Sequence, residues 1–210
     1  MVELNAIRKS YRERTVLDIP RLVVRDGEAV AIVGANGSGK TTLLRILAGT
    51  LKADTGTLSV PRETLYMPQQ AYAFRGSVLD NILLGVKGRR EKANELLERL
   101  ELSRLADKKA SSLSAGELQR MALCRLLIRP CALLLLDEPT ASCDIRSALL
   151  VADALAQYRT ETNCTVILST HAPSFACRTA ERLLVLNDGR VQKDGDPKSL
   201  LTDGTNLNEI

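Results

Sequence analysis

The glycine-rich segment Gly34–Thr41 carries the residue types that bind a chain of phosphates. It reads Gly-Ala-Asn-Gly-Ser-Gly-Lys-Thr and lies between an apolar run at 28–33 and a helical pattern at 42–49. In a strand–loop–helix setting, such glycines let backbone N–H groups converge on a phosphate, and the helix start adds its unpaired donors. Lys40 can then reach the outer phosphates, and the Thr41 hydroxyl can help to hold Mg²⁺. The segment predicts a nucleoside triphosphate site, with a glycine-rich turn that binds nothing as the alternative. The nucleotide contacts expected here are Gly34, Ala35, Asn36, Gly37, Ser38, Gly39, Lys40, Thr41 and Thr42.

Two adjacent carboxylates follow a second apolar run. Residues 132–136 have the fully apolar character of a parallel strand that is buried on both faces, and Asp137 and Glu138 follow directly. Successive side chains of a strand point opposite ways, so we expect one carboxylate to face Mg²⁺ and the other the attacking water. An acidic turn after a core strand is the alternative. The phosphate loop argues against that alternative, because the ends of parallel strands meet at one crevice.

Strands and helices alternate along the chain around these motifs. β-type patterns lie at 2–8 and 21–33, and two short strands surround Pro61 within 56–67. From Ser77 to about Ala110 apolar residues recur at helical spacing, which indicates a helical insert. The later elements expected are a helix that follows the N-cap Ser114 and ends before Pro130, a helix at 145–158, a strand at 165–169, a short helix, and strands near 182–186 and 190–191. This order predicts an α/β fold with a largely parallel sheet and helices on both of its faces.

The composition fits one compact domain. The 210 residues are 45% hydrophobic and 26% charged, and no apolar stretch is long enough to cross a bilayer. Because the chain opens without the pattern of a leader, we expect a cytoplasmic protein. The five cysteines never stand two residues apart, which predicts buried thiols rather than disulfides or zinc ligands. The densest basic run, Lys87–Lys92, has no neighbouring aromatics, so we expect no nucleic-acid partner.

Six segments resemble, in order, the motifs of the ATP-binding cassette (ABC) ATPases. Gly34–Thr41 resembles the family's phosphate loop. The other five are the Q-loop glutamine Gln69 in Tyr66–Gln69, the signature segment Leu113–Glu117, the Walker B segment Asp137–Thr140, the D-loop Ala141–Asp144 and the switch histidine His171 in Ser169–His171. The resemblance implies one ABC domain over residues 1–210. It would have a mainly parallel core sheet, an N-terminal antiparallel β subdomain and a helical subdomain inserted at about 74–113.

The resemblance also implies roles for single residues. Glu138 would act as general base, with His171 and Gln69 completing the catalytic set. Thr41, Gln69 and Asp137 would bind Mg²⁺, Asp137 through water. The alternatives are a polar loop residue for Gln69, whose neighbour Gln70 is an equal candidate on chemistry alone, and a capping histidine for His171.

An adenine contact is expected upstream of the phosphate loop. Tyr11 precedes Lys40 at the family's usual interval and resembles the aromatic that stacks on adenine, with Val16 packed beside it. An ordinary tyrosine at a strand edge is the alternative.

The signature segment is expected to act on a second copy of the chain. The resemblance implies a head-to-tail homodimer around two ATP molecules, in which each ATP lies between Lys40 of one chain and Ser114 of the other. A pair with a different cassette remains open. The residues expected to contact nucleotide in the opposite chain are Ser114, Ala115, Gly116, Glu117 and Asp144. Ala115, Glu117 and Cys143 depart from the commonest motif residues, yet the serine hydroxyl and the Gly116 amide remain.

The family resemblance further implies membrane transport. Because the chain itself cannot span a bilayer, we expect it to sit on the inner face of the cell membrane through a permease subunit, together with an extracytoplasmic solute-binding protein. The segment 72–82 and the signature region are similar to importers of tungstate-like oxyanions, and Gly76–Val78 also resembles exporter cassettes. Because we expect a separate subunit without a fused membrane domain, we favour import. An exporter cassette and a soluble ATP switch without a membrane partner are the alternatives. Tyr72 and Phe74 are expected to meet a permease helix, or else to pack the insert against the core.

Overall fold

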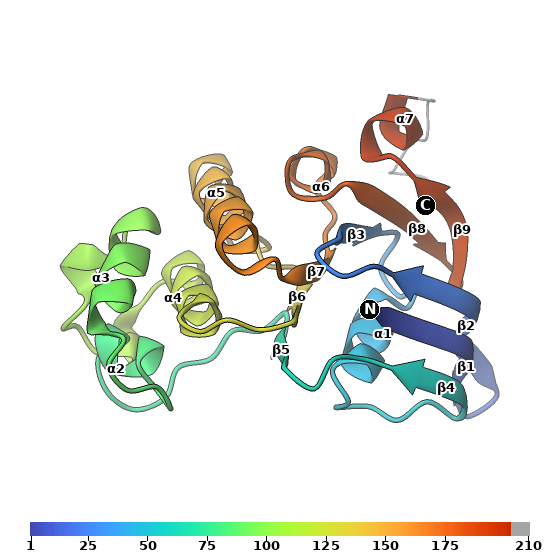
Figure 1. The fold of residues 1–210 in the computed structure, drawn as a ribbon, viewed down its shortest axis with the longest axis horizontal. Helices are drawn as coiled ribbons and strands as arrows, with labels where there is room; N and C mark the ends of the chain where they lie inside the picture. The colour runs from blue at the N-terminus through green and yellow to red at the C-terminus, as the bar shows by residue number, and fades with distance from the viewer. Residues whose placement is uncertain (203–210) are drawn as a thin grey trace.

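A six-stranded sheet forms the centre of the protein, whose computed structural model describes residues 1–202 (Figure 1). The strands run in the order β5-β6-β7-β3-β8-β9. Their bounds are Thr64–Met67 for β5, Leu133–Asp137 for β6, Thr165–Ser169 for β7, Ala29–Val33 for β3, Arg182–Asn187 for β8 and Arg190–Gly195 for β9. Neighbouring strands are parallel, except that β9 runs antiparallel to β8. The predicted α/β class and largely parallel sheet are confirmed.

The apolar runs of the sequence form the three inner strands of this sheet. Every residue of β3, β6 and β7 is buried, because cores lie on both faces. Leu133 and Leu135 enter one core, whereas Leu134 and Leu136 enter the other. The register pairs Asp137 with Ser169, and Ser169 with Ile32. The segments that follow β3, β6 and β7 therefore emerge side by side at one edge of the sheet.

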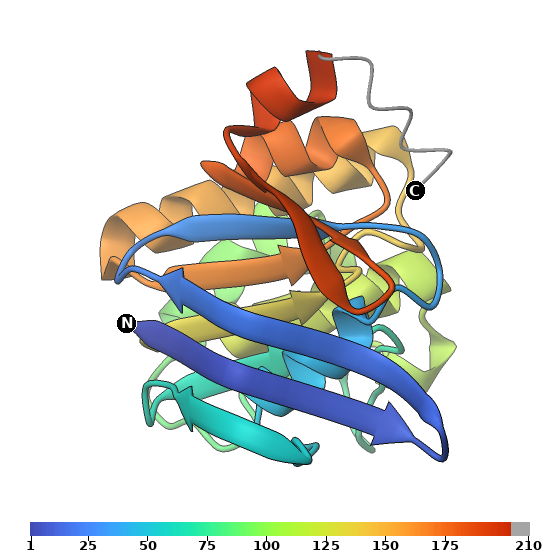
Figure 2. The same cartoon turned by 90° about the vertical axis from the view of Figure 1, so that its right-hand side faces the viewer.

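A second, antiparallel sheet covers one of these cores. It has the order β2-β1-β4, with β1 at Val2–Tyr11, β2 at Arg14–Val24 and β4 at Thr55–Ser59. Helix α1 (Lys40–Leu47) lies between the two sheets and contributes four buried aliphatic side chains to the core (Figures 1 and 2). The predicted N-terminal β subdomain is thus present. Sequence analysis missed the first half of β2, where Pro20 interrupts the strand pattern; an edge strand tolerates a proline.

The other face of the central sheet carries helices. Helices α2 (Val78–Ile82), α3 (Arg90–Arg99) and α4 (Ala115–Leu127) form a lobe at one end of the molecule (Figure 1), joined by 3₁₀ turns at Ser103–Leu105 and Ala110–Ser112. The insert expected at about 74–113 covers α2, α3 and both turns, and α4 packs into the same core. Helices α5 (Ile145–Thr162), α6 (Pro173–Thr179) and α7 (Pro197–Thr202) follow.

Two expectations need correction in detail. Helix α5 runs four residues past the predicted end at Tyr158, because the hydroxyls of Thr160 and Thr162 donate to carbonyls one turn back and Asn163 closes the helix in the left-handed conformation. All five cysteines lie within the described residues and are free, but Cys143 and Cys177 are only half-buried. Within residues 1–202, no helix combines the length and apolarity that a membrane crossing requires.

Candidate nucleotide site

The phosphate loop follows β3 and has a shape that depends on its glycines. Gly34 adopts φ 153° and Gly39 φ 108°, and a Cβ atom would lie 2.1 Å from the Leu186 carbonyl oxygen at Gly34 and 2.8 Å from the Val16 carbonyl oxygen at Gly39. Gly37 has φ 82° with open space around it. The first and last glycines are therefore required by neighbouring backbone, whereas the middle one is required by its own conformation alone.

Lys40 lies at the start of α1, beneath the loop. Its Nζ atom donates to the carbonyl oxygens of Gly34 at 2.7 Å and Ala35 at 3.1 Å, and only 6% of the residue is exposed. Burial lowers the pKa of the ammonium group, while the charges of Glu138 and Asp137 oppose that shift. The lysine thus shapes the loop and keeps a cation at its centre.

Asp137 ends β6 and is fully buried among hydroxyl donors. Its Oδ1 atom accepts from Ser169 at 2.7 Å and from Thr41 at 3.2 Å, and Oδ2 accepts from the Tyr66 hydroxyl at 3.4 Å. Burial and the neighbouring Asp137 raise the pKa of Tyr66 to about 12. A carboxylate beside a threonine hydroxyl at the mouth of a phosphate loop is the oxygen donor set that suits Mg²⁺. The residues present therefore fit the expected cation.

Glu138 stands beyond the end of the strand in the left-handed conformation, with φ 51°. Glu138 lines the pocket beside the phosphate loop, whereas Asp137 contacts the Thr41 hydroxyl. The His171 backbone N–H donates to Oε2 at 3.3 Å, and His171 Nε2 lies 3.1 Å from Oε1. Among the described residues, Oε1 is buried and accepts no aligned hydrogen bond. Burial raises the pKa of this carboxyl, partly offset by His171 and Lys40.

One pocket of about 210 Å³ collects most of the predicted nucleotide and catalytic residues. Its lining residues are Val16, Asn36, Gly37, Gly39, Lys40, Thr41, Thr42, Gln69, Glu138 and His171. Gln69 and Gln70 both line an adjacent hollow, but only Gln69 also lines this pocket, which favours Gln69 at the nucleotide. Tyr11 does not line the pocket: it ends β1 with 48% of the residue exposed, and Lys9 Nζ lies 5.6 Å from the ring centroid. Its adenine contact stays a prediction.

The signature residues lie apart from this pocket. Ser114 caps α4, its hydroxyl donates to Glu117 Oε2 at 2.7 Å, and the Glu117 backbone N–H lies 3.4 Å from that hydroxyl oxygen. The Ser114 hydroxyl and the Ser114 backbone N–H, at 2.8 Å, both donate to this carboxylate and hold the pKa of Glu117 below its usual range. Asp144 caps α5 through the Ser147 N–H at 2.7 Å. The predicted N-cap at Ser114 is confirmed, and Glu117 completes a capping box with it. Neither Ser114, Ala115, Gly116, Glu117 nor Asp144 lines the pocket of the same chain.

Sequence reasoning missed two side chains next to the site. Tyr66 was noted only as part of the Q-loop segment, yet its hydroxyl reaches Asp137. Gln119 is 2% exposed and bonds the backbone of Glu138 and Ser142. A usable signal for Gln119 was present, since a glutamine four residues before Leu123 lies on the apolar stripe of its helix.

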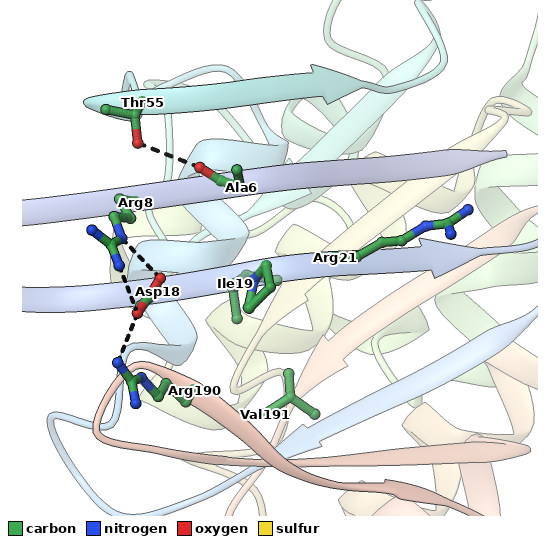
Figure 3. Close-up of a pocket in the computed structure, with 9 residues that line it drawn as sticks. Ala6, Arg8, Asp18, Ile19, Arg21, Thr55, Arg190 and Val191 are labelled. Atoms are coloured by element: carbon green, nitrogen blue, oxygen red, sulfur yellow. Dashed lines mark hydrogen bonds and ion pairs between the residues drawn. The ribbon is translucent and has the colours of Figure 1, made fainter.

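A larger hollow, of about 860 Å³, lies over the β2-β1-β4 sheet and β9 (Figure 3). Asp18 stands at one end between two arginines, with Arg8 Nε at 3.0 Å and Arg190 Nη2 at 2.9 Å. None of the residues predicted for chemistry lines this hollow. It lacks a phosphate loop and a buried carboxylate oxygen without an aligned hydrogen bond, so the smaller pocket is the candidate site.

Comparisons with known proteins find similar ATP-binding proteins. A family model described as ABC transporter matches residues 17–141. The chain is 40% identical to an aliphatic sulfonates import ATP-binding protein of Nocardia farcinica, over 92% of this chain and 80% of that protein. It is 30% identical to a spermidine/putrescine import ATP-binding protein of Haemophilus influenzae, over 99% of this chain and 61% of that protein. The chain therefore spans less than two thirds of the second relative.

Solved structures share the fold. The ATP-binding cassette MJ0796, described as dimeric in a post-hydrolysis state with ADP and Pi, aligns with a TM-score of 0.83 and 27% identity over 94% of this chain and 99% of that one. The cbiO1 protein of Clostridium perfringens, part of the transporter complex cbiONQ, aligns with a TM-score of 0.82 and 24% identity over 96% of this chain and 90% of that one.

Proposed function

Because the chain belongs to the ABC transporter family of ATP-binding cassettes, we propose that it is the subunit that hydrolyses ATP to power a membrane importer. The cassettes of this family bind ATP and couple its hydrolysis to transport. One observation carries the assignment to this chain. The phosphate loop, Lys40 and the buried Glu138 line a single pocket, where Oε1 of the glutamate accepts no aligned hydrogen bond among the described residues.

In the proposed complex, the loop amides and Lys40 hold the phosphates. The Thr41 hydroxyl and the Asp137 carboxylate hold Mg²⁺, with Gln69 beside them. When bound, that cation neutralises charge that develops on the phosphate oxygens. Val16 lies next to the loop on the side where β1 and β2 join, and Tyr11 supplies a ring for the base.

Glu138 is proposed to accept the proton of the attacking water. Burial leaves its carboxylate poorly solvated and raises its pKa, which strengthens it as a base. His171 lies beside the same carboxylate and orients it through the backbone N–H at 3.3 Å. Phosphoryl transfer depends more on positioning than on proton abstraction, so the placement of Glu138 matters as much as its basicity.

A second copy of the chain is proposed to complete each site. The signature residues at the start of α4 are exposed or half-buried and are absent from the pocket of their own chain. A twofold pair would bring Ser114 and Gly116 of one chain to the ATP of the other, with Asp144 at the interface. The related cassette with ADP and Pi is described as dimeric, which supports this arrangement.

Import through a permease on the inner face of the cell membrane is supported by the relatives. The similar curated proteins are named for the import of sulfonates, of spermidine and putrescine, and of Fe(3+) ions. These relatives are 30–40% identical to this chain and are named for very different solutes. We therefore propose that the cassette does not select the solute. The permease and a solute-binding protein would do so, and an oxyanion is our proposal for the solute.

Purification of the tagged chain from gently solubilised membranes of its source cells tests this function. We expect a polytopic membrane protein to co-purify in a stoichiometric amount and to be identified by mass spectrometry, together with a solute-binding protein. The Lys40→Ala chain serves as the control for binding that depends on the nucleotide cycle. Recovery of soluble partners alone would contradict the transport function and favour the soluble ATP switch. Recovery of a permease fused to a second cassette would favour export over import.

A further inference from the structure

Both polar atoms of the Gln119 carboxamide form hydrogen bonds with the backbone that follows β6. Its Nε2 atom donates to the Glu138 carbonyl oxygen at 2.7 Å, and its Oε1 atom accepts from the Ser142 N–H at 3.0 Å. The side chain is 2% exposed, so neither bond competes with bulk water. One glutamine on α4 thereby spans the turn that begins with Glu138 and ends in the D-loop.

The backbone of Glu138 is the part of the site that needs such support. Its φ of 51° is a conformation that residues other than glycine rarely adopt, and the surrounding structure must maintain it. Ser169 accepts its N–H at 2.9 Å, and the Ala141 N–H reaches its carbonyl at 3.1 Å. Both restraints come from the sheet or from the turn itself. The bond from Gln119 comes from the helical lobe.

The start of α4 is held tightly against the same turn. A Cβ atom at Gly116 would lie 2.8 Å from the Ser142 carbonyl oxygen, so the helix and the turn approach as closely as a glycine permits. Next to Gln119, Arg120 donates to the Leu100 carbonyl at 3.0 Å and to the Ser147 hydroxyl at 2.7 Å. A displacement of the first turns of α4 must therefore displace the 138–142 turn or break these bonds.

We propose that Gln119 is a positioning residue that ties Glu138 to the start of α4 and thereby couples the two ATP sites of the dimer. The inference rests on the proposed function, because it takes Ser114 and Gly116 to contact the partner's ATP. When the contact with the partner's ATP fixes the position of α4, the carboxamide of Gln119 holds the Glu138 carbonyl in place. The orientation of the Glu138 carboxylate is fixed in turn. ATP bound to one chain then positions Glu138 of the other chain, through α4 and Gln119 of that other chain.

Steady-state ATP hydrolysis by Gln119→Met tests the proposal. Methionine fills a similar volume without either hydrogen bond, so we expect kcat to fall at least about tenfold while the KM for ATP changes less than about twofold. We also expect the Hill coefficient to fall from a value above one to one. The matched control is Gln157→Met, which replaces an exposed glutamine bonded to Glu161 and should match the wild type.

Two further measurements separate positioning from packing. Gln119→Glu keeps the shape and the bond from Ser142 but cannot donate to Glu138 once its carboxyl is ionised, so above about pH 9 it should lose kcat as Gln119→Met does. In the Glu138→Gln background, measured by single turnover, Gln119→Met should cost less than about twofold, because the group it positions is already gone. Equal losses in both backgrounds, or unchanged kcat in the Gln119 variants, would overturn the proposal. Absence of hydrolysis by the wild type would instead overturn the proposed function.

Discussion

Replacing Glu138 with glutamine is expected to lower kcat for ATP hydrolysis by about 10²- to 10⁴-fold while ATP still binds. The amide is nearly isosteric with the carboxylate but cannot accept the water proton. It also removes a charge whose burial raises the pKa of the carboxyl. The phosphate loop and Lys40 lie on other elements and keep their positions, so nucleotide affinity should change little.

Hydrolysis and assembly should be measured together for this variant. Because the bound ATP persists, Glu138→Gln should elute as a dimer with ATP, whereas the wild type returns to monomer as it turns over. Glu98→Gln replaces an exposed glutamate of α3, far from the pocket, and serves as the control. Wild-type turnover by Glu138→Gln would remove this residue from the role of base, with His171 the next candidate.

Replacing Lys40 with alanine is expected to weaken ATP binding by at least about a hundredfold. The substitution removes the ammonium group at the centre of the loop, and with it the bonds to the carbonyls of Gly34 and Ala35. Both the charge that attracts the outer phosphates and the geometry of the loop are lost. The affinity is best measured by equilibrium binding of a fluorescent ATP analogue at fixed ionic strength, since charge interactions are salt-dependent.

Two control variants distinguish charge from loop shape. Lys92→Ala removes a cation that pairs with Glu161 at 2.9 Å on the helical lobe, and it should bind ATP as the wild type does. Lys40→Arg retains a cation with a different shape, so it should bind more tightly than Lys40→Ala and less tightly than the wild type. Equal affinity of Lys40→Ala and the wild type would contradict the assignment of this loop as the phosphate site.

The site was largely predictable where function depends on a local segment. The glycine loop and the N-cap at Ser114 each lie within a few residues of sequence, and the structure has both. The apolar run at 132–136 predicted a buried strand, and the strand occupies Leu133–Asp137. In these cases the chemistry is set by residue types at fixed spacing on one element.

Prediction was weaker where two distant segments meet. Nothing local to Gln119 says that its amide reaches Glu138 nineteen positions away, or that Gly116 lies against the Ser142 carbonyl. The left-handed conformation of Glu138, with φ 51°, could not be read from the local sequence either. Tyr11 is about half-exposed and does not line the pocket, so its contact with adenine stays a prediction.

The most direct test of the central claim is ATP hydrolysis by a mixture of two inactive chains. The claim is that each site joins the phosphate loop of one chain to the signature segment of the other. Lys40→Ala lacks a working loop, and Ser114→Arg blocks the start of α4 but keeps its own loop and Glu138.

Each variant alone should be inactive, whereas an equal mixture should regain activity with a ceiling of about a quarter of the wild type. Coupling through Gln119 lowers the recovery below that ceiling, because the other site of a mixed dimer holds no ATP. Random pairing makes half of the dimers mixed, and each mixed dimer holds one intact site of two. Full activity of Ser114→Arg alone, or a mixture as inactive as its components despite ATP binding by the Ser114→Arg chain, would contradict the account.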